Sequence, residues 1–153
     1  MNMMTNPRQV EATTGLLAEY EKNHADLLGA MAVMDSVTRA VLADRDLVSN
    51  ARWRLSHASL RRRMLWGRVY RHLSPRVGPS DAAALNRIQA IDFALQQQSA
   101  AHVGKWTADA VEANWDGYCE ASRAIRWKMD AYIAAERRVV HPLLAADALG
   151  QRR

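Results

Sequence analysis

Residues 115–144 read WDGYCEASRAIRWKMDAYIAAERRVVHPLL, and their larger apolar side chains recur at steps of three and four. The row that follows these steps is Val111, Trp115, Tyr118, Ser122, Ile125, Met129, Tyr132, Glu136, Val139 and Leu143. Such spacing keeps side chains on one face of an α-helix and is typical of helices that pack at shallow angles. We call a row of this kind a seam. Glu136 is therefore expected to be a carboxylate within a buried, mostly apolar helix face.

Three earlier segments carry seams of the same kind, and each contains an ionisable residue. His24 lies in the first seam and Asp92 in the third. The second contains Arg62, and a slight rotation of that helix would place Arg61 there instead. Unpaired ionisable groups in a core cost several kcal/mol unless they meet a partner or a metal. The sequence therefore predicts one buried polar cluster, made of His24, Arg61 or Arg62, Asp92, Tyr132 and Glu136.

The composition favours helices in a single domain over residues 1–153. Nearly half of the 153 residues are hydrophobic, and there are only 7 Gly and 4 Pro. Breaks are expected at Asn6-Pro7, residues 44–50, residues 74–80 (with Ser80 as a cap), residues 104–107 (with Thr107 as a cap), Pro142 and Gly150. Four helical segments with short connections result. The predicted fold is all-α, an antiparallel up-down-up-down four-helix bundle, with flexible ends at residues 1–6 and 150–153.

The quoted stretch resembles the last helix of the hemerythrin-like, or HHE cation-binding, family. In that family a His is followed four residues later by Glu and then by an apolar-aromatic-Pro-Leu-Leu ending. Glu136 falls on the family's carboxylate, while Tyr132 stands in the place of the His. Residues 20–28, YEKNHADLL, resemble the opening ligand segment, with His24 as the ligand. The likeness extends from about His24 to Leu144 and implies a bundle with a di-iron site.

Other positions depart from the family's ligand pattern. Counting back from residues 69–73, VYRHL, places Arg61 on a His position and Leu65 on a Glu position. Asp92 stands where another His is usual. Guanidinium has no lone pair to offer a metal, but it can neutralise buried carboxylates. We therefore expect no cofactor and a lost di-iron site; if a metal is bound, non-haem iron held by His24, Asp92 and Glu136 is the alternative.

The remaining charge lies mainly in one basic stretch, residues 45–76. Its arginines are Arg45, Arg52, Arg54, Arg61, Arg62, Arg63, Arg68, Arg71 and Arg76. Such a stretch can meet nucleic acid, but a solvated helix face is the preferred interpretation. No apolar run approaches the ~20 residues needed to span a bilayer. The single Cys119 excludes an internal disulfide, so we expect a cytoplasmic protein with no membrane contact.

The tryptophans, the cysteine and the remaining histidines have expected places of their own. Trp115 and Cys119 are expected in the core, whereas Trp53, Trp66 and Trp127 fall off the seams and suit a partner surface or a place under Arg side chains. His57 and His72 are expected at the surface. His102 and His141 fit capping or packing.

Three functions remain open, in order of preference. The first is a non-enzymatic sensory or interaction module that has lost its iron and can take a small ligand in the eroded metal pocket. The second is a residual metalloprotein for oxygen, nitric oxide or iron handling. The third is a basic nucleic-acid-binding protein. A homodimer or a protein partner, docked through exposed aromatic side chains, is compatible with each.

Overall fold

The computed structural model describes residues 6–150, and within that range the chain is helical with no strand. The elements are α1 (Pro7–Val37), α2 (Arg45–Leu73), the short 3-10 helix η1 (Ser74–Arg76), α3 (Pro79–Lys105), α4 (Ala108–Ala113) and α5 (Trp115–Ala148). The all-α class is confirmed. The ends predicted to be flexible lie outside the described residues, except for Asn6 and Gly150.

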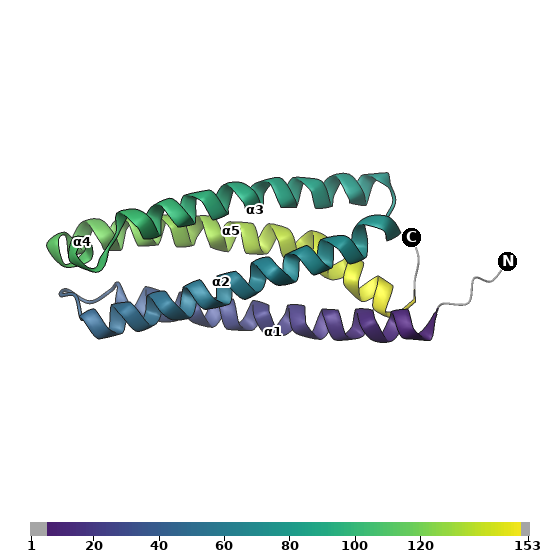
Figure 1. The fold of residues 1–153 in the computed structure, drawn as a ribbon, viewed down its shortest axis with the longest axis horizontal. Helices are drawn as coiled ribbons and strands as arrows, with labels where there is room; N and C mark the ends of the chain where they lie inside the picture. The colour runs from purple at the N-terminus through teal and green to yellow at the C-terminus, as the bar shows by residue number, and fades with distance from the viewer. Residues whose placement is uncertain (1–5, 151–153) are drawn as a thin grey trace.

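The four long helices lie along the longest axis of the molecule (Figure 1). The chain passes along the molecule in α1, returns in α2, passes along it again in α3 and returns in α5. α1 packs against both α2 and α5, and α3 packs against α5. Short α4 lies at the end where α3 gives way to α5. α5 therefore contacts helices from both halves of the chain.

Capping side chains begin four of these helices, two of them as expected. The Asn6 side chain accepts a hydrogen bond from the backbone N–H of Arg8 at the start of α1, and Thr107 accepts one from Ala110 at the start of α4. The expectation of a turn at residues 44–50 is wrong, because α2 already begins at Arg45. Asp44 instead caps α2 through the N–H groups of Asp46 and Leu47, so the connection lies earlier, over residues 38–44.

Two other expected boundaries are also corrected. Ser80 is not a cap, because α3 already begins at Pro79, a residue that suits the first helical turn. Pro142, which was expected to kink or end the last helix, does not end it, since α5 continues to Ala148. A break that the sequence analysis missed separates α4 from α5 at Asn114, whose side chain accepts from the N–H of Gly117. A β-carbon at Gly117 would collide with that Asn114 side chain, so a larger residue there would require the cap to move.

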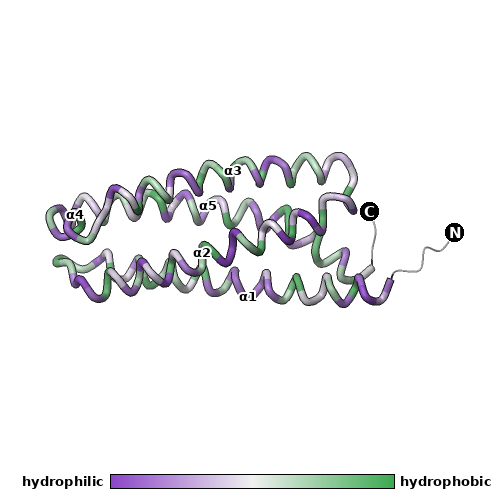
Figure 2. The backbone as a smooth tube through the Cα atoms, viewed as in Figure 1, coloured by the Kyte–Doolittle hydropathy of each residue, from purple (hydrophilic) through white to green (hydrophobic). Residues whose placement is uncertain are grey.

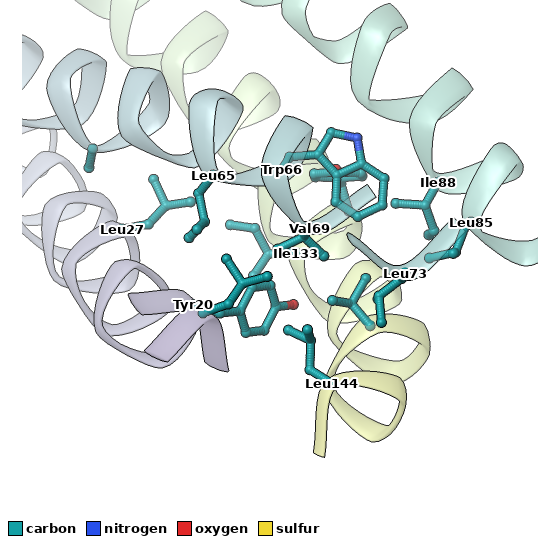
Figure 3. Packing of buried hydrophobic residues seen from close by; sticks show 14 of the residues in the cluster. Tyr20, Leu27, Leu65, Trp66, Val69, Leu73, Leu85, Ile88, Ile133 and Leu144 are labelled. Atoms are coloured by element: carbon teal, nitrogen blue, oxygen red, sulfur yellow. The ribbon is translucent and has the colours of Figure 1, made fainter. Parts of the chain in front are cut away.

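The core is built from the inward faces of these helices. Figure 2 shows hydrophobic and hydrophilic positions alternating along each of the long helices. Figure 3 shows the packed interior, where Tyr20, Leu65, Val69, Ile133 and Leu144 approach one another from α1, α2 and α5. Burying one such aliphatic side chain contributes about 1.5–3 kcal/mol. Most of the driving force for folding therefore comes from these faces.

Trp66 is part of this core, which corrects its expected place outside the seams. Its side chain is 5% exposed and packs beside Leu85 and Ile88 of α3 (Figure 3). The inward face of α2 is wider than one seam, because both Leu65 and Trp66 point inward. A second, smaller cluster lies near α4 and consists of Val48, Trp106, Val111 and Tyr118. Within residues 6–150, no helix has the length and apolar character that a membrane crossing requires.

Candidate functional site

A buried ion pair joins α2 to α5. The guanidinium of Arg62 contacts Oε1 of Glu136, and the two side chains are 6% and 0% exposed. Arg61, the alternative for this position, is 52% exposed and lies 3.8 Å from the surface carboxylate of Asp26. Adjacent residues of an α-helix point in directions about 100° apart, and here that rotation turns Arg61 away from the core. Arg62 is therefore the buried arginine.

Two tyrosine hydroxyls complete the surroundings of the Glu136 carboxylate. Tyr132 donates a hydrogen bond to Oε2 over 2.6 Å, and Tyr20 donates one to Oε1 over 3.0 Å. Burial, followed by the charge of Glu136, raises the pKa of both Tyr20 and Tyr132 well above its ordinary value. Both phenols therefore stay protonated at any physiological pH. They act as fixed donors to the carboxylate.

The arginine is in turn positioned by α1. Nη1 of Arg62 donates to Oδ1 of Asn23 over 3.3 Å, and Nη2 donates to the Tyr20 hydroxyl over 3.3 Å. The amide of Asn23 also donates to the backbone carbonyl of Ala58 on α2, which fixes its orientation. The guanidinium carbon lies 4.5 Å from the centre of the Tyr20 ring. Nε of Arg62 is buried with no hydrogen-bond partner among the described residues.

Sequence reasoning did not find Tyr20 and Asn23. Tyr20 lies in the first seam, four residues before His24. A tyrosine at such a position is equally consistent with an ordinary core aromatic and with a hydrogen-bond donor. Asn23 lies outside that seam, one position before His24. A buried arginine needs several acceptors, and an inward-facing Asn on the neighbouring helix is a signal that could have found it. The polar cluster therefore consists of Tyr20, Asn23, Arg62, Tyr132 and Glu136.

His24 and Asp92 are half-buried beside this cluster, and Asp92 reaches its edge, because a contact with the Tyr132 hydroxyl acts to lower the pKa of Asp92. Neither is among the hydrogen-bond partners of Glu136 in the described part of the chain. Nδ1 of His24 is buried without a hydrogen-bond partner there, and burial, with the charges of Arg137 and Arg62, lowers the pKa of His24. Asp92 accepts a hydrogen bond from Gln96 over 2.6 Å, and burial raises its pKa.

These residues do not fit a di-iron centre. Both oxygens of Glu136 already accept hydrogen bonds, and the permanent cation of Arg62 lies directly against that carboxylate. A second positive charge at the same place would be repelled, and guanidinium offers no lone pair. Across residues 6–150, no group of three or more His, Cys, Asp or Glu side chains is arranged to hold a metal ion. His24, Asp92 and Glu136 therefore do not form one ligand set in this arrangement.

A second polar cluster, also missed by the sequence analysis, joins the ends of three helices. Nε2 of His72 lies 2.8 Å from Oδ2 of Asp147, and the hydroxyl of Thr13 donates to the same oxygen over 2.8 Å. The expectation that His72 lies at the surface is wrong, since its side chain is 16% exposed. Thr13 is fully buried. The cluster connects α1, α2 and α5 at the end opposite α4.

The basic stretch of α2 is partly neutralised by acids from neighbouring helices. Arg45 pairs with Asp109 and Glu112, and Arg68 pairs with Glu19 over 2.5 Å. With Arg61 beside Asp26 and Arg62 buried, four of the nine arginines face a carboxylate. The positive electrostatic potential that would attract a nucleic-acid backbone is reduced by these ion pairs.

The remaining aromatic and sulfur-containing residues divide between core and surface. Trp53 and Trp127 are 68% and 73% exposed, as their places outside the seams predict, and the Trp53 ring stacks on His57. Trp115 is only half-buried, which corrects its expected core position, and its indole N–H donates to the carbonyl of Ala40. Cys119 is buried, as expected.

The other two histidines lie on α3 and α5. His102 is half-buried near the end of α3 and stacks on Tyr118. His141, on α5, lies 2.9 Å from the Glu21 carboxylate of α1. Each contacts a neighbouring helix, in keeping with a packing role.

Comparison of the chain with family models, with curated proteins and with solved structures finds no match. The class of protein that fold and site define is thus an all-helical domain with a buried arginine–glutamate–tyrosine cluster. The resemblance to the hemerythrin-like family rests on the residues quoted above.

Proposed function

We propose that this chain is an antiparallel up-down-up-down four-helix bundle of the hemerythrin-like type whose metal has been replaced by an arginine. In this proposal it acts as a non-enzymatic sensory or interaction module in the cytoplasm. The observation that carries the proposal is the buried contact between Arg62 and Glu136. It lies where the resemblance expects a ligand carboxylate, and the partner of that carboxylate is a permanent cation.

Charge balance explains how a bundle of this type can do without iron. A lone buried carboxylate is unstable by several kcal/mol, and a metal ion or a hydrogen-bonded guanidinium can each compensate for it. Here Arg62 supplies the positive charge, while Tyr20 and Tyr132 supply hydrogen bonds to both carboxylate oxygens. Tyr132 and Glu136, which fall on ligand positions in the resemblance, thus become part of a structural connection between helices. The charge comes from Arg62, the neighbour of the position that the resemblance assigns to a His.

The same contacts argue against acid–base catalysis at Glu136. A general base needs an accessible lone pair within hydrogen-bond reach of its substrate. Glu136 is fully buried, and its two oxygens already accept bonds from three side chains. Its charge is also held by the arginine. The cluster is therefore better suited to stabilising a fold than to turning over a substrate.

Exposed apolar side chains support an interaction role. Trp53, Leu60 and Met64 lie on α2 at helical spacing and are each about half exposed or more, at 68%, 49% and 66%. Trp127 adds a further exposed indole on α5. Large apolar groups on a surface are typical of sites that contact another protein. A second copy of this chain or a different protein is the partner that this surface suits.

Elemental analysis of protein purified without chelators tests the proposal. We expect far less than one iron per chain, and we expect thermal unfolding to be unchanged by a strong chelator or by added ferrous iron. Two irons per chain, with a stability that falls when the chelator is added, would overturn it and would favour the residual metalloprotein. Gel filtration of the same sample reports whether the exposed face forms a dimer.

A further inference from the structure

A cavity of about 490 Å³ lies among α2, α3 and α5, between the Arg62–Glu136 pair and α4. Its size falls within the range of roughly 300–1,000 Å³ that is usual for small-molecule sites. Residues that line it include Leu55 and Arg63 of α2, Val103 of α3, and Tyr118 and Met129 of α5. Arg62 and Glu136 are not among its lining residues. The cavity is therefore distinct from the polar cluster described above.

The walls of the cavity are mainly apolar. Leu55, Leu60, Val103, Ile125 and Met129 present aliphatic or thioether groups to it. A hydrocarbon chain placed against them would gain about 0.8 kcal/mol for each methylene group removed from water. Methionine adapts easily to different shapes, so the wall suits a flexible chain. A ligand that fits this part of the cavity is therefore expected to have an apolar portion.

The charged groups of the cavity are all of one sign. Arg52, Arg63 and Arg126 line it, and its lining contains no Asp or Glu. Arg126 is already engaged, because it donates to Asp35 and Thr38. Arg52 and Arg63, in contrast, form no ion pair with a carboxylate within residues 6–150. Arg52 instead lies over the Tyr118 ring and donates weakly to the carbonyl of Val103, over 3.5 Å.

His102 responds to the same positive field. It lines the cavity, and burial lowers its pKa, with the charges of Arg52 and Lys105 acting in the same direction. The imidazole is thus kept neutral near physiological pH and can donate a hydrogen bond without adding charge. Ser59 and Ser99 provide further hydroxyl donors on the lining. An anion placed here would meet two arginines and several neutral donors.

We propose that this cavity binds an amphiphilic anion, a single-chain carboxylic acid whose carboxylate meets Arg52 and Arg63 while its hydrocarbon chain lies against the apolar wall. Arginine pairs well with carboxylates because its planar fork can form two parallel hydrogen bonds. The inference names a ligand class for the sensory module and so rests on the proposed function. The two fail separately, since iron content and carboxylate binding are measured independently.

Isothermal titration of the full chain with monomeric decanoate is the direct test. We expect saturable one-to-one binding that is at least tenfold tighter than binding of decanol and absent for decyltrimethylammonium. Arg52→Gln and Arg63→Gln should each weaken decanoate binding by about 10–100-fold, because a charge-assisted hydrogen bond contributes ~1.5–3 kcal/mol. Arg54→Gln, an exposed position on the same helix outside the lining, is the matched control and should bind like the parent chain.

A second variant addresses the apolar wall. Ser99→Leu places a larger side chain in the cavity at a half-buried helix position, and it should reduce decanoate affinity at least tenfold without lowering the midpoint of thermal unfolding. Equal affinity for decanol and decanoate would overturn the proposal, as would unchanged binding in Arg52→Gln and Arg63→Gln. Absence of binding heat at millimolar decanoate at both 10 °C and 35 °C would also overturn it, because apolar burial is nearly heatless only close to one temperature.

Discussion

The guanidinium of Arg62 lies against the carboxylate of Glu136, a residue 74 positions later in the chain, and both side chains are almost completely buried. The pair joins the middle of α2 to the later part of α5. Hydrogen bonds from Tyr20 and Tyr132 hold the carboxylate, and Asn23 holds the guanidinium. Removing any one member leaves another buried polar group without its partner. The first two predictions follow from this dependence.

Arg62→Met should destabilise the protein by about 3–5 kcal/mol, because it leaves the Glu136 carboxylate buried and uncompensated. Since small proteins have a total stability of about 5–15 kcal/mol, this variant should be close to unfolding at 37 °C. Adding Glu136→Gln removes the orphaned charge and should recover more than half of the loss. Urea denaturation measures each value. Arg61→Met is the control and should change stability by no more than about 0.5 kcal/mol; equal losses at both positions would contradict the assignment.

Tyr132→Phe should cost about 1.5–3 kcal/mol, since it deletes a hydrogen bond to a buried, charged acceptor. The matched control is Tyr70→Phe. Its hydroxyl donates over the same distance, 2.6 Å, to Asn86, but that bond is exposed to water. The control should lose about 0.5 kcal/mol or less, because water replaces the missing partner. Similar losses for both variants in denaturant titrations would show that the carboxylate does not need the Tyr132 donor.

Asp147 should make stability depend on pH in acid. Burial raises the pKa of Asp147, but hydrogen bonds from Thr13 and His72 and the charges of His72 and Arg76 outweigh this effect, so its pKa lies below the usual 3.8. A carboxyl group with a lowered folded-state pKa stabilises the fold fully above its unfolded-state pKa. That stabilisation is lost as the pH falls through the lower, folded-state value.

Asp147→Asn should therefore lower the free energy of unfolding at pH 7 by about 1 kcal/mol. This loss corresponds to a decrease of roughly 2–4 °C in the midpoint of thermal unfolding. The difference from the parent chain should shrink below about pH 4. Thermal unfolding followed by circular dichroism from pH 2.5 to 7 gives the curve. Asp130→Asn, at an exposed position of α5, controls for removal of an acid. If the difference in unfolding midpoint between Asp147→Asn and the parent chain is the same at every pH, the ionised carboxylate is not the source of the stabilisation.

Nucleic-acid binding through α2 should be weak. Four of the nine arginines in residues 45–76 already face carboxylates, which leaves five for phosphates. At 0.15 M salt we expect a duplex dissociation constant no tighter than the non-specific range of about 10⁻⁴–10⁻⁶ M. Fluorescence anisotropy with labelled duplex DNA and single-stranded RNA measures it. Submicromolar binding that weakens steeply with salt, and that disappears when Arg52, Arg63 and Arg71 are changed to Glu, would instead support a nucleic-acid-binding protein.

The local sequence determined much of this architecture. Steps of three and four placed Glu136, and either Arg61 or Arg62, on inward helix faces, since a helix of 3.6 residues per turn keeps such positions on one side. Asn6 and Thr107 marked helix starts because their side chains can accept from free N–H groups. Asp44 and Asn114 are equally suitable caps, but their surroundings hid them. Asp44 stands at the head of a polar stretch that indicates a turn, and Asn114 lies between the seam positions Val111 and Trp115.

Only the tertiary structure decided which polar groups meet. Periodicity cannot separate Arg61 from Arg62, because both lie at the edge of the same apolar face and the difference is a rotation set by packing against α1 and α5. It also cannot show that Asn23 and Tyr20 reach the guanidinium, or that His24 and Asp92 remain beside the cluster. The sequence by itself determined that charge would be buried in a helical core. Packing determined its partners, because hydrogen bonds need defined distances and directions that spacing along one helix does not contain.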